Sequence, residues 1–244
     1  MYPVDIYLND EMKSIQKVLR DFTDKEIIPV RKELDSQEGP EVAGNIFKKL
    51  KDIGLQSHYA PEEYGGNGCA SALMVAIMSE ELARGDGGIA MSQAISSAAP
   101  WFPLEVGKNK TLLDIMGPQW CGDEVMSFST VFTEPNGGCD AELFEMAGTT
   151  IKTTAILDGD EYVINGQKNW PTNAGRTPGW MFVVCTTDPS LGYDGIAMMY
   201  IPVPIEGMTM GKAEQKMGYR SCVNRTVYFD DVRVPQEYRV DGKG

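Results

Sequence analysis

The chain has 244 residues, of which 42% are hydrophobic, enough to bury the core of one large domain or of two smaller ones. Its formal net charge of −13 argues against a nucleic-acid partner, because phosphate binding requires clustered Lys and Arg side chains. No apolar run approaches the roughly 20 residues that span a bilayer, so membrane insertion is not expected, and the charged N-terminal residues predict a cytoplasmic protein without a targeting peptide.

The first residues predict an amphipathic helix. Asn9 is a suitable N-cap, and apolar side chains recur at helical spacing from Met12 to Phe22. A second helix is expected from about Pro40, a residue favoured in the first turn, to Gly54, which can adopt the left-handed conformation that ends a helix. Both helices would bury one face only.

Two further helices are expected beyond a turn-rich loop. Residues 71–84 are apolar nearly all round, as in a helix buried among others. A less regular helix follows Gly88, and Pro100 and Pro103 are expected to kink or break it.

After Gly122 the sequence changes to short β-rich runs separated by Gly, Asp, Asn and Pro, which is typical of a β-sandwich or barrel. The predicted fold class is therefore α+β, with an all-α domain at residues 1–122 and a β-domain at residues 123–244. The expected strands lie within residues 125–132, 149–157, 161–166, 180–187, 195–203 and 226–234.

The cysteines are five in number, widely spaced and without a C-x-x-C pair, which argues against disulfides, zinc and iron–sulfur clusters. No metal site is predicted. We expect reduced, small apolar side chains at Cys69, Cys121, Cys139, Cys185 and Cys222.

One segment is not explained by packing alone. Residues 128–140 (FSTVFTEPNGGCD) predict a strand that ends in a Gly-rich turn, and such turns present backbone N–H groups but are common in β-proteins. The segment resembles the flavin-binding signature of acyl-CoA dehydrogenases. Residues 165–175 (NGQKNWPTNAG) resemble that family's second flavin segment, and residues 207–235 resemble the end of its β-domain. Weaker agreement at residues 54–68 extends the resemblance over essentially the whole chain.

The resemblance implies FAD as the cofactor. It places the hydroxyl of Thr133 and neighbouring backbone N–H groups along the pyrimidine edge of the flavin, Trp170 against the ring, and the hydroxyl of Thr172 near the reactive nitrogen. Taken alone, Trp170 would equally suit the core of a sandwich. The implied flavin-binding residues are Thr130, Val131, Phe132, Thr133, Gly138, Cys139, Trp170, Pro171 and Thr172.

The implied substrate is an acyl-CoA thioester, with Cys139 and Ser96 as substrate-binding residues. This chain has Cys139 where the family usually has Ser, and a thiol is a poorer donor. Pro171 replaces a common Ile and removes one backbone N–H. The net negative charge is unfavourable for a polyanionic CoA ester, so local donors or another chain would have to bind it.

Several other polar residues suggest function less strongly. His58 is the sole histidine and lacks a nearby partner in the sequence, so a structural role is favoured. Glu134 and Asp140 resemble an acid pair, yet the family uses these positions to organise the backbone. Arg220 and Arg225 are expected to face a ligand, another subunit or solvent.

The family reaction is α,β-dehydrogenation to a 2-enoyl-CoA, with electrons passed to an electron-transfer flavoprotein. The catalytic base lies in the family's C-terminal helical domain, so none is assigned here, and a C-terminal-domain partner subunit in a homo- or hetero-tetramer is expected. The alternatives are a non-catalytic flavin- or CoA-binding or regulatory subunit, and an enoyl-CoA reductase or oxidase on the same fold.

Overall fold

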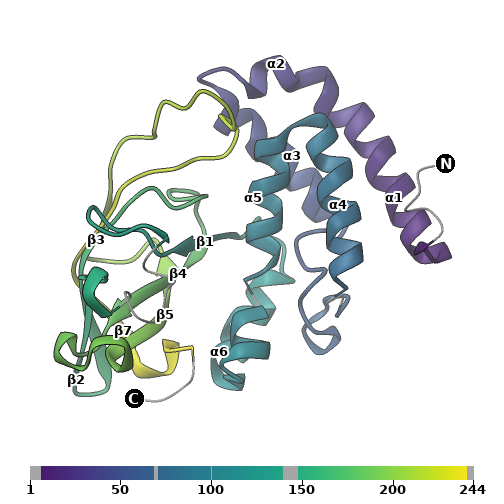
Figure 1. The fold of residues 1–244 in the computed structure, drawn as a ribbon. Coiled ribbons are helices and arrows are strands. Elements are labelled where there is room, and N and C mark those ends of the chain that lie inside the picture. The colour runs from purple at the N-terminus through teal and green to yellow at the C-terminus, as the bar shows by residue number, and fades with distance from the viewer. Residues whose placement is uncertain (1–6, 69–70, 100, 140–147, 241–244) are drawn as a thin grey trace.

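The computed structural model describes residues 7–68, 71–99, 101–139 and 148–240. Helices occupy the first half, on one side of the molecule, and a sheet occupies the second half on the other side (Figure 1). The α-helices are α1 (Asp10–Phe22), α2 (Arg31–Leu34), α3 (Gly39–Asp52), α4 (Ala72–Gly85), α5 (Gly87–Ser97) and α6 (Lys110–Trp120). Short π or 3-10 turns lie at Thr23–Ile27, Ile28–Val30, Glu62–Tyr64, Phe102–Val106, Pro189–Gly195 and Gln236–Tyr238.

The helix boundaries follow the predicted capping residues. The Asn9 side chain accepts a hydrogen bond from Met12 N at 2.8 Å, which satisfies one of the unpaired donors of the first turn of α1. Gly54 has a φ of +80° and ends the turn after α3, as expected for a glycine at this position. These two predictions are confirmed.

The helices bury a core of their own. Its members come from α1 to α5 and the connections between them: Leu19, Ile27, Leu34, Ala43, Ile46, Phe47, Leu50, Leu55, Met74, Met78, Leu82, Ile89 and Ala90. A partly buried charge pair also joins α1 to α4, since Arg20 donates two hydrogen bonds to the carboxylate of the buried Glu81. The helical part is therefore held by both apolar and polar contacts.

The strands form one mixed sheet in the order β1-β4-β2-β3-β7-β6, with β5 paired to β4. The parallel pairs are β1 with β4 and, at one residue pair, β2 with β4; the others are antiparallel. The predicted α+β class is confirmed. The strands are β1 (Ser127–Val131), β2 (Thr154–Asp158), β3 (Glu161–Lys168), β4 (Gly179–Thr186), β5 (Ile196–Val203), β6 (Met208–Met210) and β7 (Val227–Pro235).

Strand β4 is buried along its whole length, and its two faces belong to different cores. Met181 and Val183 pack against residues of the other strands, whereas Trp180 and Phe182 pack on the opposite face toward α6. Successive side chains of a strand point to opposite faces of the sheet, which accounts for this alternation. The sheet therefore carries apolar side chains on both faces, and one face packs against a helix.

Some elements differ from expectation. Residues 148–150 are helical, so the predicted strand over 149–157 begins only at Thr154. Helix α6 was not predicted, although Asn109 caps it by accepting a hydrogen bond from Leu112 N at 3.0 Å. The described part of the chain contains no helix long and apolar enough to cross a membrane.

Buried polar side chains fix the helices against the sheet. Gln56 donates to the carbonyls of Trp120 and Glu124, both at 3.0 Å, and accepts from Met126 N at 2.9 Å. The Tyr200 hydroxyl donates to Ala99 O at 2.6 Å. Because unpaired buried polar groups are costly, these hydrogen bonds fix the position of the chain between α6 and β1 relative to the helices.

Candidate functional site

Two segments of the predicted flavin site lie side by side. The backbone N–H of Asn169 donates a hydrogen bond to Thr133 O at 2.8 Å, and Thr133 lies just beyond the end of β1. The Ser129 hydroxyl donates to Thr172 O from within β1. The residues after β3 are thereby held along β1, and two segments distant in sequence form one surface.

The turn after β1 is closed by reciprocal backbone hydrogen bonds between Glu134 and Gly137, at 2.8 and 3.2 Å. The Glu134 carboxylate accepts hydrogen bonds from Lys152 N at 2.7 Å and Thr153 N at 3.0 Å. It therefore organises the backbone of this turn and of the chain entering β2. The predicted partner Asp140 lies outside the described residues.

A buried ion pair supports the same turn. Lys168 Nζ lies 2.8 Å from the Glu134 carboxylate and also donates to Phe132 O at 2.8 Å, and both side chains are almost fully shielded from solvent. Burial alone would raise the pKa of Glu134, but the Lys168 ammonium and the Thr153 hydrogen bond outweigh it and the pKa is lowered. Glu134 is consequently held as a carboxylate.

The backbone at Trp170 adopts an unusual conformation with a φ of +26°. The Asn224 side chain stabilises it by donating to Trp170 O at 2.7 Å, and Lys216 Nζ in turn lies 2.5 Å from the Asn224 side-chain oxygen. The indole is 52% exposed, which is high for a tryptophan. Trp170 is thus presented at the surface by contacts to its backbone.

The nine predicted flavin-binding residues divide by exposure. Val131 is 0% exposed in the sheet core and Pro171 is buried, so neither residue presents its side chain to a ligand. Thr130, Phe132, Thr133, Gly138 and Thr172 are partly exposed, and Cys139 and Trp170 are exposed. Within the described part of the chain, the hydroxyls of Thr133 and Thr172 have no recorded hydrogen-bond partner.

The two predicted substrate-binding residues have different surroundings. Cys139 is exposed beside Gly138, while Ser96 is half-buried on α5. Ser96 Oγ accepts from Phe128 N at 3.3 Å and from Asn173 Nδ2 at 3.2 Å, so it holds β1 and the 171–176 segment against the helix. Substrate binding by either residue stays a prediction.

Comparison with known proteins identifies the family. The model of the acyl-CoA dehydrogenase N-terminal domain matches residues 9–109, and that of the acyl-CoA dehydrogenase middle domain matches residues 129–232. The chain belongs to the acyl-CoA dehydrogenase family. A probable acyl-CoA dehydrogenase of Bacillus subtilis is 34% identical over 93% of this chain and 57% of its own length.

Solved acyl-CoA dehydrogenases have the same fold. Butyryl-CoA dehydrogenase from Megasphaera elsdenii matches with a TM-score of 0.80 and 27% identity, over 95% of this chain and 58% of that one. An acyl-CoA dehydrogenase from Bacillus anthracis, complexed with FAD, matches with a TM-score of 0.81 and 26% identity, over 98% and 38%. The chain spans about half the length of the curated relatives it matches.

The other candidates from the sequence have contacts of their own, and Arg225 packs against Gly175 of the second predicted flavin segment. His58 is buried where α4 and α5 meet. Arg220 donates to Asp35 O at 2.8 Å, and Arg225 donates to Gly211 O at 3.0 Å. Among the described residues no group of His, Cys, Asp or Glu is arranged to bind a metal ion, and the four described cysteines are unpaired.

Sequence reasoning missed the residues that hold the site together, Asn173 and Asn224. Asn173 has a φ of +67° and donates through Nδ2 to Ser92 O, Ser96 Oγ and Phe128 O, which ties the 171–176 segment to α5 and β1. The sequence signal that could have indicated Asn173 is its residue type, because Asn tolerates the left-handed conformation and can form local hydrogen bonds.

The single histidine gives a pH prediction. His58 Nδ1 is hydrogen-bonded to Leu55 O at 2.6 Å, Nε2 is buried without a partner among the described residues, and burial lowers the pKa below its ordinary value of 6.5. The unfolded chain therefore binds the proton more readily, so stability falls as the pH drops below about 6.5, by at most about 1.4 kcal/mol per pH unit.

Urea unfolding of the wild type and His58→Gln between pH 7.5 and 5.5 measures this effect. We expect a shallower decline in the variant, and flavin binding near the wild-type level. Parallel stability profiles, or a folded variant that fails to bind flavin, would contradict the assignment of His58 as a buried structural residue.

Proposed function

We propose that this chain forms the flavin-binding half of an FAD-dependent acyl-CoA dehydrogenase, which converts an acyl-CoA thioester to a 2-enoyl-CoA and passes electrons to an electron-transfer flavoprotein. The observation that carries the proposal is the half-exposed Trp170, together with the hydroxyls of Thr133 and Thr172, which have no hydrogen-bond partner among the described residues. An exposed indole on a segment that is hydrogen-bonded to a neighbouring threonine offers an apolar face and a polar group to a ligand.

The available groups fit a flavin. An isoalloxazine ring has polar atoms along its pyrimidine edge and an apolar face, which suit the threonine hydroxyls and the indole. FAD is also the cofactor found in the Bacillus anthracis relative. When bound, it would supply the hydride acceptor for oxidation at the substrate β-carbon.

The chain's own residues would position the cofactor and stabilise charge. The Lys168–Glu134 pair fixes the carbonyl of Phe132, and Asn224 fixes the carbonyl of Trp170. Fixing these carbonyls also fixes the backbone that carries the neighbouring Thr133 and Thr172 hydroxyls. Hydrogen-bond donors held in place before the reaction stabilise developing negative charge without the cost of reorganisation. The Thr133 hydroxyl is the donor that we assign to the pyrimidine edge, and Thr172 to the reactive nitrogen.

Proton abstraction from the substrate α-carbon requires a base that Glu134 does not provide. Its carboxylate accepts hydrogen bonds from Lys152 N and Thr153 N and contacts Lys168, and its lowered pKa makes it a weak base. We assign the base to the part of the enzyme that corresponds to the region of the relatives not matched by this chain. That portion would come from further chain or from a partner subunit in a tetramer.

The test uses the complete assembly purified with any partner subunit. We expect saturated acyl-CoA esters to bleach the visible flavin band, an artificial electron acceptor to restore it, and the most effective ester to identify the substrate class. The 244-residue chain alone serves as a control and should hold FAD weakly. An assembly that contains FAD but whose flavin band no saturated ester bleaches would contradict the proposal and favour a non-catalytic or reductive role.

A further inference from the structure

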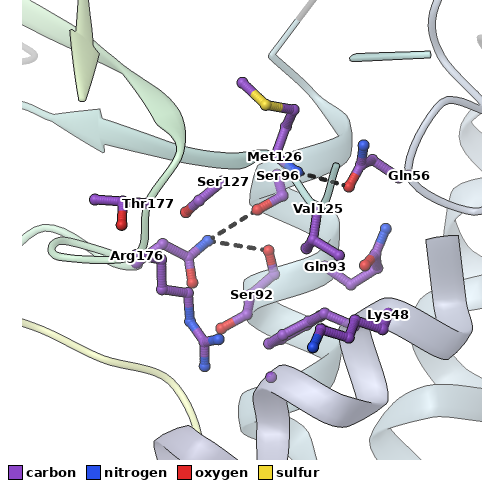
Figure 2. Close-up of a pocket in the computed structure, with 13 residues that line it drawn as sticks. Lys48, Gln56, Ser92, Gln93, Ser96, Val125, Met126, Ser127, Arg176 and Thr177 are labelled. Atoms are coloured by element: carbon purple, nitrogen blue, oxygen red, sulfur yellow. Dashed lines mark hydrogen bonds between the residues drawn. The ribbon is translucent and has the colours of Figure 1, made fainter. Parts of the chain in front are cut away.

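The connection between β6 and β7, residues 211–226, reaches from the sheet to the helices (Figure 1). It is attached to the second predicted flavin segment at two places. Thr172 and Asn224 form an isolated antiparallel β-bridge. Further along, Arg176 donates to Ser221 O at 2.8 Å, and Figure 2 shows its side chain extending toward α3. The connection therefore supports the segment that carries the exposed indole.

The conformation of Trp170 depends on this support. Its φ of +26° lies in a region that residues other than glycine adopt only where surrounding contacts hold them. Asn224 Nδ2 supplies such a contact by donating to Trp170 O at 2.7 Å. Because the indole is 52% exposed, neighbouring side chains restrict it less than they restrict a core tryptophan, so its direction follows the backbone.

Lys216 determines which end of the Asn224 amide faces Trp170. Lys216 Nζ lies 2.5 Å from Asn224 Oδ1 and 2.5 Å from Cys222 O. An ammonium group only donates, a backbone carbonyl only accepts, and an Asn side chain has one end of each kind. With the amide turned over, Oδ1 would face the Trp170 carbonyl and Nδ2 would face the ammonium group. Both contacts would be repulsive, so the Lys216 charge favours the orientation that donates to Trp170 O.

We propose that Lys216 is a positioning residue for the predicted flavin site, and that its ammonium group acts through the Asn224 amide on the backbone and indole of Trp170. Flavin as the ligand rests on the proposed function, whereas the relay from Lys216 through Asn224 to Trp170 consists of contacts within this chain. The flavin-binding residues implied by the sequence all precede residue 173, so Lys216 is an addition to that set.

Heteronuclear NMR of the 244-residue chain tests the relay without flavin. The chain has four tryptophans, and Trp170→Phe identifies the indole N–H signal of Trp170. Lys216→Met should shift or broaden that signal and leave the other indole signals in place, whereas Lys216→Arg, which keeps a charged donor, should restore it. Lys212→Met removes an exposed lysine from the same connection and should change nothing. An unmoved Trp170 signal in Lys216→Met would overturn the proposal.

Asn224→Asp separates positioning from general support of the connection. The aspartate keeps an acceptor for Lys216 but has no donor for Trp170 O. We expect the Trp170 signal to move as in Lys216→Met, while the thermal midpoint stays at or above that of the wild type. This variant also provides the test if Lys216→Met fails to fold, and a wild-type Trp170 signal in it would contradict the relay.

FAD retention in the complete assembly links the relay to the flavin. Lys216→Met should weaken retention by about tenfold, the scale of one hydrogen bond to a charged group. In an Asn224→Leu background the same change should cause no further loss, because the relay is already broken. A further loss of the same size would mean that Lys216 acts by another route. A shifted Trp170 signal in an assembly whose flavin no acyl-CoA bleaches would contradict only the proposed dehydrogenase activity.

Discussion

Replacing Lys168 with Met should destabilise the protein by about 3–5 kcal/mol, because the change leaves the buried Glu134 carboxylate without its counter-ion. The Phe132 carbonyl would lose its donor as well. Urea denaturation followed by circular dichroism gives the free energy of unfolding. In the complete assembly, the same variant should lose flavin, because the turn after β1 would no longer be fixed.

Two comparisons isolate the buried pair. Lys17→Met breaks a solvent-exposed pair with Asp21 and should change stability little, since such pairs are weak. The double variant Lys168→Met/Glu134→Gln should be more stable than Lys168→Met alone, because no buried charge is left uncompensated. If Lys168→Met proves as mild as Lys17→Met, the ion pair does not organise the site.

Trp170→Ala should weaken FAD retention in the complete assembly by roughly fivefold to 150-fold, if stacking on the indole is worth about 1–3 kcal/mol as it is for nucleic-acid bases. Stability should change little, because the side chain is half exposed and the backbone contacts of Asn224 remain. Equilibrium dialysis with FAD measures retention, and thermal unfolding of the apoprotein measures stability.

Tyr228→Ala is the matched control for this experiment. Tyr228 is another exposed aromatic residue, 42% accessible on β7, and it belongs to none of the flavin segments. Its removal should leave FAD retention unchanged. Equal losses in the two variants would mean that Trp170 acts only as a general surface aromatic residue.

The helices and strands that were predicted correctly carry strong local signals. Asn9 and Gly54 mark helix ends through capping chemistry that depends on neighbouring residues. Helix α6 was missed because Pro118 lies inside it, and a proline normally argues against a helix interior. Strand β6 was missed because it has three residues, too few to show an alternating pattern, and it pairs with β7 at the edge of the described sheet.

The candidate site was only partly predictable, because its supporting contacts are not local in the sequence. Thr133, Trp170 and Thr172 were found from motifs, but the contacts that hold them join residues far apart in the chain. Asn224 reaches back 54 residues to Trp170, and Asn173 reaches back 81 residues to Ser92. Such pairs leave no periodic pattern in the sequence, so only the folded chain reveals them.

The separate core of α1 to α5 has a consequence for synthesis on the ribosome. The core beneath α1 to α5 draws on residues 19–90, so the helical half can collapse before the strands are made. Among the described strands β1 pairs only with β4 (Gly179–Thr186), and until β4 emerges the backbone donors and acceptors of β1 lack these partners. The nascent chain therefore passes through an interval in which an unpaired strand follows a folded domain, and chaperone dependence should be greatest in that interval.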